Sequence, residues 1–209
     1  MRRPFDDTTR RNIASRCATF SRLPPEEAAP GLKRAAVAIA LTGARDTSET
    51  AVLLTRRASS LRSHRAQWAL PGGRCDAGET QTEAALRELR EELGLALAED
   101  AVLGLLDDYP TRSGYLITPV VVWAGLGQAI VPNLAEVASV HPIPLDAIER
   151  GDAFDFISIR ESTRRVIRFH WEQRLIHAPT AAMIYQFREV LGGRDTRVAD
   201  LEQPVFAWK

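Results

Sequence analysis

Residues 72–95 read GGRCDAGETQTEAALRELREELGL, the stretch with the strongest structural signal in the chain. Its second part predicts a helix over residues 80–93, because it lacks Pro and Gly and its apolar side chains recur at helical spacing. Gly94 then ends the helix, as glycine commonly does. At about 100° per residue, one face of this helix gathers three carboxylates beside an apolar stripe suited to packing on a sheet. These carboxylates belong to Glu88, Glu91 and Glu92.

Three carboxylates on adjacent turns repel one another and lower the stability of the helix unless a cation lies among them. Oxygen ligands of this kind suit Mg²⁺ or Mn²⁺ and do not suit zinc. We therefore expect a divalent metal at this helix face, with the backbone carbonyl of Gly72 close enough to add a ligand. A pair between Arg87 and Glu79 would tie the glycine-rich loop to the helix and hold the carboxylates in register.

Short apolar segments separated by turns make up most of the remaining chain. Two buried strands, 35–41 and 51–55, predict a hairpin. The other predicted strands cover residues 67–70, 102–107, 116–124, 136–143, 165–169 and 174–176, with turn chemistry at Tyr109-Pro110 and a helical turn over 144–150. Together with a closing helix over residues 178–191, the pattern predicts a mixed α/β fold.

The first residues form a separate feature. Spaced apolar side chains between residues 5 and 23 predict a short amphipathic helix, and prolines and polar residues follow it. We expect residues 1–30 to be an N-terminal helical extension and linker, and residues 31–209 to be the main domain.

Composition excludes several classes of protein. The 209 residues include 27 basic and 27 acidic side chains, for a formal net charge of zero. Domains that bind nucleic-acid backbones carry a basic excess, so we expect no nucleic-acid partner. Two cysteines cannot form a disulfide framework. There is no apolar stretch for a signal peptide, and the longest apolar runs are strand-sized, so we expect a cytoplasmic protein without membrane contact.

The spacing Gly73-x5-Glu79-x7-Arg87-Glu88-Leu89-x-Glu91-Glu92-x-Gly94-Leu95 matches the Nudix box at every position, and the chain resembles the Nudix hydrolase family. The resemblance implies the Nudix fold, a mixed β-sheet sandwiched between α-helices, and hydrolysis of a diphosphate linked to another moiety. It also implies that Glu88, Glu91 and Glu92 hold the Mg²⁺ or Mn²⁺. Arg87 and Glu79 then have a mainly architectural role in the catalytic motif.

The segment before this box contains Leu53, Leu54, Thr55, Arg57, Ala58, Arg62, Pro71, Gly72 and Gly73. In these positions it is similar to the element that marks the coenzyme A pyrophosphatase branch of the family. It carries arginines suited to binding phosphates, although a solvated basic loop is the alternative. The resemblance implies that coenzyme A or an acyl-CoA is cleaved to 3′,5′-ADP and (acyl-)4′-phosphopantetheine. Arg57, Arg62 and His64 are the candidate substrate contacts. Two positions depart from the branch pattern, where Ala66 replaces a glycine and Leu70 a phenylalanine.

Several alternatives remain open. We expect a small-molecule nucleotide diphosphate as the substrate, and ADP-ribose, NADH or a nucleoside triphosphate would also suit the same box. A non-catalytic ligand-binding module is an alternative of a different class. Glu91 or Glu92 is a candidate general base, and so is Glu136, which lies outside the box. A homodimer is possible, since the N-terminal helix could dock on the core or on a second subunit.

Overall fold

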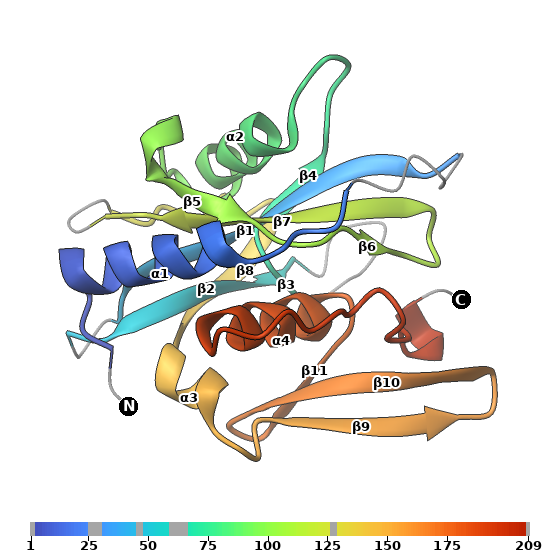
Figure 1. Ribbon diagram of the computed structural model, residues 1–209. Coiled ribbons are helices and arrows are strands. Elements are labelled where there is room, and N and C mark those ends of the chain that lie inside the picture. Colours follow the sequence, from blue (N-terminus) through green and yellow to red (C-terminus); the bar gives the residue numbers. More distant parts are fainter. Residues whose placement is uncertain (1–2, 25–30, 45–47, 59–66, 126–128, 208–209) are drawn as a thin grey trace.

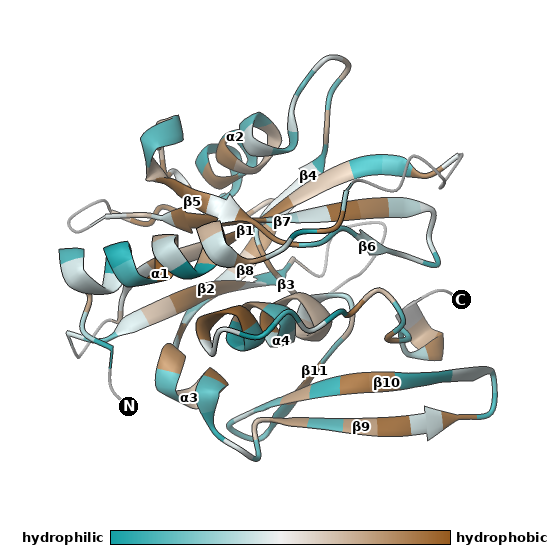
Figure 2. Ribbon diagram, viewed as in Figure 1, coloured by the Kyte–Doolittle hydropathy of each residue, from teal (hydrophilic) through white to brown (hydrophobic). Residues whose placement is uncertain are grey.

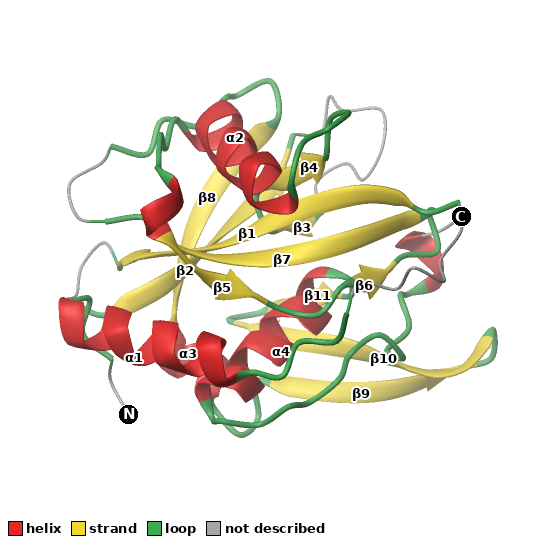
Figure 3. Cartoon of the chain, turned by 45° about the horizontal axis from the view of Figure 1, so that its top comes forward, coloured by secondary structure: helices red, strands yellow, loops and turns green. Residues whose placement is uncertain are grey.

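The structure is a computed structural model that describes residues 3–24, 31–44, 48–58, 67–125 and 129–207. Its main feature is a mixed sheet with helices on both faces, and a smaller sheet lies beyond one of these helices (Figures 1 and 3). The predicted fold class, a mixed β-sheet between α-helices, is confirmed. The helices are α1 (Asp7–Thr19), α2 (Gln81–Leu93), α3 (Leu145–Glu149) and α4 (Thr180–Leu191), with two short 3₁₀ helices at Glu99–Ala101 and Val205–Ala207.

The main sheet has the strand order β3-β2-β1-β7-β5, while β4 pairs with β1, β6 with β7 and β8 with β2. Only β1 and β7 run parallel among these pairs of described strands. The strands are β1 (Lys33–Gly43), β2 (Thr50–Arg57), β3 (Trp68–Ala69), β4 (Gly72–Arg74), β5 (Val102–Leu105), β6 (Tyr109–Pro110), β7 (Tyr115–Trp123) and β8 (Val137–Pro144). The second sheet has the order β11-β10-β9 and contains β9 (Phe154–Ile159), β10 (Ser162–Trp171) and β11 (Arg174–His177). The predicted β1–β2 hairpin is confirmed.

Strand β1 is buried on both faces, and its alternating residues divide the core into two parts. Ala36, Ala38 and Ala40 face α2, where small side chains allow the helix to approach the sheet closely. The larger Val37 and Ile39 face the opposite core, which includes α1 and α4. The apolar colouring of β1 and β7 in Figure 2 follows from this burial on both sides.

Helix α2 begins and ends where the sequence predicts. Thr80 is the N-cap and forms a reciprocal capping box with Glu83. Gly94 closes the helix with φ 71°, a conformation that glycine adopts without strain. Because both ends are fixed, the carboxylate face has a defined orientation toward β4 and β1.

Three strands are absent from the sequence prediction. Strands β4 (Gly72–Arg74) and β6 (Tyr109–Pro110) have three and two residues and pair with β1 and β7, and segments this short contain no periodicity to detect. The turn predicted at Tyr109-Pro110 is therefore wrong. The third is β9, which pairs antiparallel with β10, where Ile157 lies opposite Val166.

Helix α1 packs on the core through Ile13 and Cys17, against β5 and α4. Burial raises the pKa of the Cys17 thiol to about 12, and both cysteines are free, as predicted. Within the described residues, no helix is long and apolar enough to cross a membrane. The boundary expected after residue 30 stays a prediction.

The C-terminal segment is held against β10 by the buried carboxylate of Glu202, which is 2 % exposed. Arg112 donates to it at 3.1 and 2.5 Å, Ser162 at 2.7 Å and the backbone of Gln203 at 3.0 Å. The hydrogen bond from Arg112 lowers the pKa of Glu202 to about 2, with help from Ser162 and the Gln203 amide.

Replacing Glu202 with Gln is expected to lower the free energy of unfolding by about 1–3 kcal/mol at pH 7, because one buried acceptor becomes a donor. The lowered pKa means that the carboxylate stabilises the fold above its unfolded pKa near 4.5 and loses this effect as pH falls toward 2. Urea unfolding at pH 7 and pH 3 measures both effects. The difference between wild type and E202Q should shrink at the lower pH, and an equal difference at both values would contradict the assignment.

Candidate active site

The last two turns of α2 present the three predicted carboxylates at different depths. The side chain of Glu92 is 4 % exposed, that of Glu88 14 % and that of Glu91 49 %. Glu91 therefore faces solvent, whereas the other two lie between the helix and the sheet.

Arg87 connects this helix to the loop that precedes it. Its guanidinium donates to Glu79 at 2.9 and 3.1 Å and to the Arg74 carbonyl at 2.9 Å. It also donates to Glu88 at 2.9 Å and to Glu91 at 3.1 Å. The hydrogen bonds between Arg87 and Glu79 lower the pKa of Glu79 and raise the pKa of Arg87. The predicted pair between Arg87 and Glu79 is confirmed.

Glu92 is a buried carboxylate whose negative charge is only weakly offset by its surroundings. Burial raises its pKa to about 8, and the negative charge of Glu88 adds to the rise. The Arg57 guanidinium, whose Nη1 lies 3.9 Å from Oε1 of Glu92, and a hydrogen bond from the Gly72 amide act in the opposite direction. At neutral pH the buried carboxylate therefore favours either a proton or a cation.

The Gly72–Gly73 dipeptide brings bare backbone to these carboxylates. A Cβ on Gly73 would lie 2.2 Å from Oε1 of Glu88, so that only glycine leaves room for the carboxylate in this position. Across the β1–β4 ladder, the Ala38 amide donates a hydrogen bond to the Pro71 carbonyl, and the Cys75 amide donates one to the Arg34 carbonyl. Because hydrogen-bonded pairs alternate along such a ladder, the N–H and C=O of Gly72 point away from β1.

Glu136 lies beside the same helix, just before β8. The loop that carries it caps α2, since the Asn133 amide donates to the Glu92 carbonyl at 2.9 Å and the Glu136 amide donates to the Asn133 carbonyl. The negative charge of Glu136 contributes to the raised pKa values of Glu88 and Glu92. This candidate from outside the box therefore adjoins the carboxylate face.

These donors fit Mg²⁺ or Mn²⁺, because carboxylate and backbone carbonyl oxygens are the ligands of hard cations and no thiol or imidazole accompanies them. Within the described residues, no group of three or more acidic, His or Cys side chains converges as a metal cluster. The Arg87 guanidinium donates to both Glu88 and Glu91 and supplies positive charge there. The residue types therefore suit a metal, while Glu88 and Glu91 accept hydrogen bonds from Arg87 and Glu92 lies 3.9 Å from Arg57.

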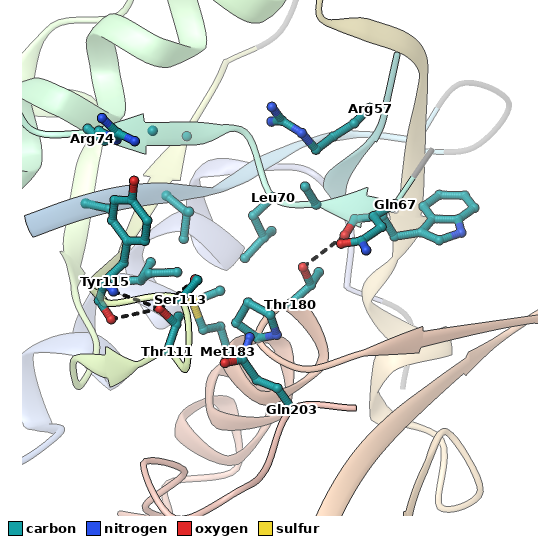
Figure 4. A pocket seen from close by; sticks show the side chains of 18 residues that line it. Arg57, Gln67, Leu70, Arg74, Thr111, Ser113, Tyr115, Thr180, Met183 and Gln203 are labelled. Carbon is teal, nitrogen blue, oxygen red and sulfur yellow. Dashed lines mark hydrogen bonds between the residues drawn. The ribbon is translucent and has the colours of Figure 1, made fainter. Parts of the chain in front are cut away.

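A pocket of about 430 Å³ adjoins this site (Figure 4). Arg57 and Gln67 lie at one end and Arg74 and Tyr115 at the other, with Leu70 between them. The remaining lining residues come from β1, β3, β4, β7, α4 and the segments near them: Ala35, Val37, Trp68, Ala69, Gly72, Gly73, Thr111, Ser113, Ile117, Pro179, Thr180, Met183 and Gln203.

The predicted substrate contacts are distributed unevenly. Arg57 lines the pocket and also faces Glu92, and its Nε is buried without a hydrogen-bond partner among the described residues. Leu70, one of the two departures from the branch pattern, is 3 % exposed and lines the same pocket. Arg62, His64 and Ala66 lie outside the described residues.

Several residues that line the pocket from β7, α4 and the C-terminal segment were not predicted from the sequence. Tyr115 and Ile117 share one face of a strand, and Thr180 and Met183 share one face of a helix, so periodicity could have grouped each pair. Gln203 carries no such signal, since it is brought to the pocket by a hydrogen bond of 2.7 Å from the Arg112 amide. The link between α4 and β3, in which the Thr180 hydroxyl donates to the Trp68 carbonyl at 3.1 Å, is also visible only in three dimensions.

The chain is similar in sequence to several known proteins. A protein of Photorhabdus laumondii named "Uncharacterized Nudix hydrolase NudL" is 36 % identical over 141 residues, which cover 66 % of this chain and 75 % of that protein. "Nudix hydrolase 3" of Caenorhabditis elegans is 41 % identical over 101 residues, or 46 % of this chain and 42 % of that protein.

A solved structure, a MutT/nudix family protein from Enterococcus faecalis, superposes with a TM-score of 0.55 at 20 % identity. The match covers 81 % of this chain and 65 % of that one, and it supports the fold. The family model described as "NUDIX domain" matches residues 32–162, which include the whole carboxylate face of α2. The chain belongs to the Nudix family.

Proposed function

We propose that this protein is a metal-dependent diphosphatase that cleaves coenzyme A or an acyl-CoA to 3′,5′-ADP and (acyl-)4′-phosphopantetheine. One observation supports it above the others: the carboxylate face of α2 meets a pocket lined by arginines at the bare backbone of Gly72 and Gly73. A substrate with a diphosphate in its middle and a further group beyond it suits this arrangement.

In the proposed reaction Glu88, Glu91, Glu92 and the Gly72 carbonyl would hold the metal. A bound Mg²⁺ or Mn²⁺ would supply positive charge to the site and would lower the pKa of a water molecule. Arg57 donates hydrogen bonds to a phosphate oxygen from the pocket side, where its Nε has no other described partner. Arg87 and Glu79 position the helix and the loop without touching the substrate.

The chemical step is attack of water on one phosphorus and cleavage of its bond to the bridging oxygen. The electron pair of that bond stays on the departing phosphate, and the proton of the water passes to a carboxylate. Glu91, Glu92 and Glu136 are the candidate bases. Glu136 adjoins the carboxylate face from outside the box, as the effect of its charge on two of the glutamates indicates.

A panel of substrates tests the proposal directly. The purified protein is incubated with Mn²⁺ and CoA, acetyl-CoA, ADP-ribose, NADH or deoxynucleoside triphosphates, and the products are separated by chromatography. Release of 3′,5′-ADP from CoA is the expected result. Cleavage of ADP-ribose or NADH with CoA untouched would support the alternative, a Nudix hydrolase for another nucleoside diphosphate. No cleavage of any substrate, with binding retained, would support the non-catalytic module.

Metal binding has an expected result that does not depend on turnover. A cation that binds only the folded state at 100 times its Kd stabilises the protein by about 2.7 kcal/mol. We therefore expect Mn²⁺ to raise Tm by roughly 5–10 °C for a chain of this length. Thermal unfolding with MnCl₂, compared with KCl at equal ionic strength, measures the shift. The shift should vanish in a Glu88→Gln, Glu92→Gln double variant, and an undiminished shift would place the metal elsewhere.

A further inference from the structure

The Arg74 end of the pocket contains an arginine without a carboxylate partner. Among the described residues, the guanidinium of Arg74 contacts the ring of Tyr115, with its Cζ 5.2 Å from the ring centroid, and no salt bridge joins it to Asp or Glu. Arg57 lines the other end, and the described lining residues include no Asp or Glu. The positive charge of Arg57 is shared with Glu92, whose Oε1 lies 3.9 Å away, whereas no carboxylate of the described residues offsets that of Arg74, which favours an anionic ligand at the Arg74 end.

Arg74 lies on the side of the sheet away from the α2 carboxylates. It pairs with Ala35 across the β1–β4 ladder, and paired residues of neighbouring strands point to the same face. Ala35 and Val37 line the pocket together with Met183 of α4, whereas Ala36 faces α2. Arg74 is therefore placed for a part of the substrate beyond the diphosphate that the metal would hold.

We propose that Arg74 and Tyr115 form a distal subsite that binds a phosphate monoester remote from the bond that is cleaved. This inference rests on the proposed function, in which the 3′-phosphate of coenzyme A is that group. A phosphate monoester carries close to two negative charges at neutral pH and accepts two parallel hydrogen bonds from a guanidinium. The Tyr115 ring lies beside Arg74 at the same end of the pocket and, through its contact with the guanidinium, limits the orientations that this group can adopt (Figure 4).

Product binding without metal tests the subsite separately from catalysis. Isothermal titration in EDTA compares the affinity for 3′,5′-ADP with that for 5′-AMP, which lacks the 3′-phosphate. The wild type is expected to prefer 3′,5′-ADP by about tenfold or more, as one charged hydrogen-bonded contact would give. The variant Arg74→Gln should lose this preference while its affinity for 5′-AMP stays the same.

Arg90→Gln is the matched control, because Arg90 is an exposed arginine of α2 that does not line the pocket. It should keep the preference of the wild type. Arg74 is itself exposed and its backbone carbonyl still accepts from Arg87 in the variant, so the fold should be retained, which a thermal scan verifies.

Three results would overturn the subsite: no preference in the wild type, an unchanged preference in R74Q, or an equal loss of affinity for both nucleotides. The last would indicate that the adenine ring stacks at Tyr115. The substrate panel reports on the proposed function independently. A preference that depends on Arg74 in a protein that leaves CoA intact would keep the subsite and reject the substrate. Cleavage of CoA together with an unchanged nucleotide preference in R74Q would support the proposed function and reject the subsite.

Discussion

Replacing Glu92 with glutamine is expected to reduce kcat by roughly 10³-fold, because under the proposed function Glu92 is a metal ligand, and its loss would remove several kcal/mol of charge stabilisation from the transition state. Glu92 is the most buried of the three carboxylates and accepts a hydrogen bond from the Gly72 amide. The glutamine oxygen can still accept that hydrogen bond, so the helix and β4 should keep their positions. Steady-state kinetics with Mn²⁺ and the substrate identified by the panel measure the effect.

An exposed carboxylate far from α2 provides the control for this experiment. Glu172 lies in the turn between β10 and β11, away from α2, and Glu172→Gln makes the same chemical change there. This variant should retain wild-type kinetics. Both variants should unfold at the temperature of the wild type in EDTA. Activity within threefold of wild type in E92Q would exclude Glu92 as a metal ligand.

Alanine substitutions at the two adjacent glycines are expected to have opposite consequences. At Gly72 a Cβ would lie 2.3 Å from the Ala36 carbonyl oxygen and 2.6 Å from the Cα of Val37, and the residue has φ 156°. Backbone cannot move aside without disrupting the β1–β4 ladder. We expect Gly72→Ala to lower the free energy of unfolding by about 1–3 kcal/mol.

At Gly73 the Cβ would meet only the carboxylate of Glu88, which can rotate away. Gly73→Ala should therefore leave the free energy of unfolding almost unchanged. It should reduce kcat by about 100-fold, because a displacement of about 1 Å in a catalytic group has an effect of that size. Urea unfolding and kinetics on both variants separate the two cases. A stable and fully active G73A would show that the position of Glu88 against β4 is unimportant.

The sequence allowed the central helix and its carboxylates to be predicted because the signals there are local. Thr80, Glu83 and Gly94 define the ends of α2 within the helix itself, and the glutamates share a face by spacing alone. The burial of β1 follows in the same way from its run of Ala, Val, Ile and Leu.

The environment of those carboxylates could not be predicted, because it depends on contacts between distant segments. That Arg87 reaches Glu88 and Glu91 as well as Glu79 is a matter of side-chain geometry. The contact of Arg74 with Tyr115 depends on the pairing of β4 and β7 with β1. The pocket wall from α4 lies beyond residue 162, where the family match ends.

The bare backbone of β4 has one more consequence for substrate choice. The α2 carboxylates lie on one face of the main sheet and the distal subsite on the other, and Gly72 and Gly73 separate them. A molecule that occupies both must bend around the sheet margin, with its diphosphate at the glycines and a substituent on either side. Under the proposed function, this arrangement would select substrates by what flanks the diphosphate. A compound with groups on both sides of its diphosphate reaches both faces of the sheet. A compound that ends in a free terminal phosphate reaches only one face.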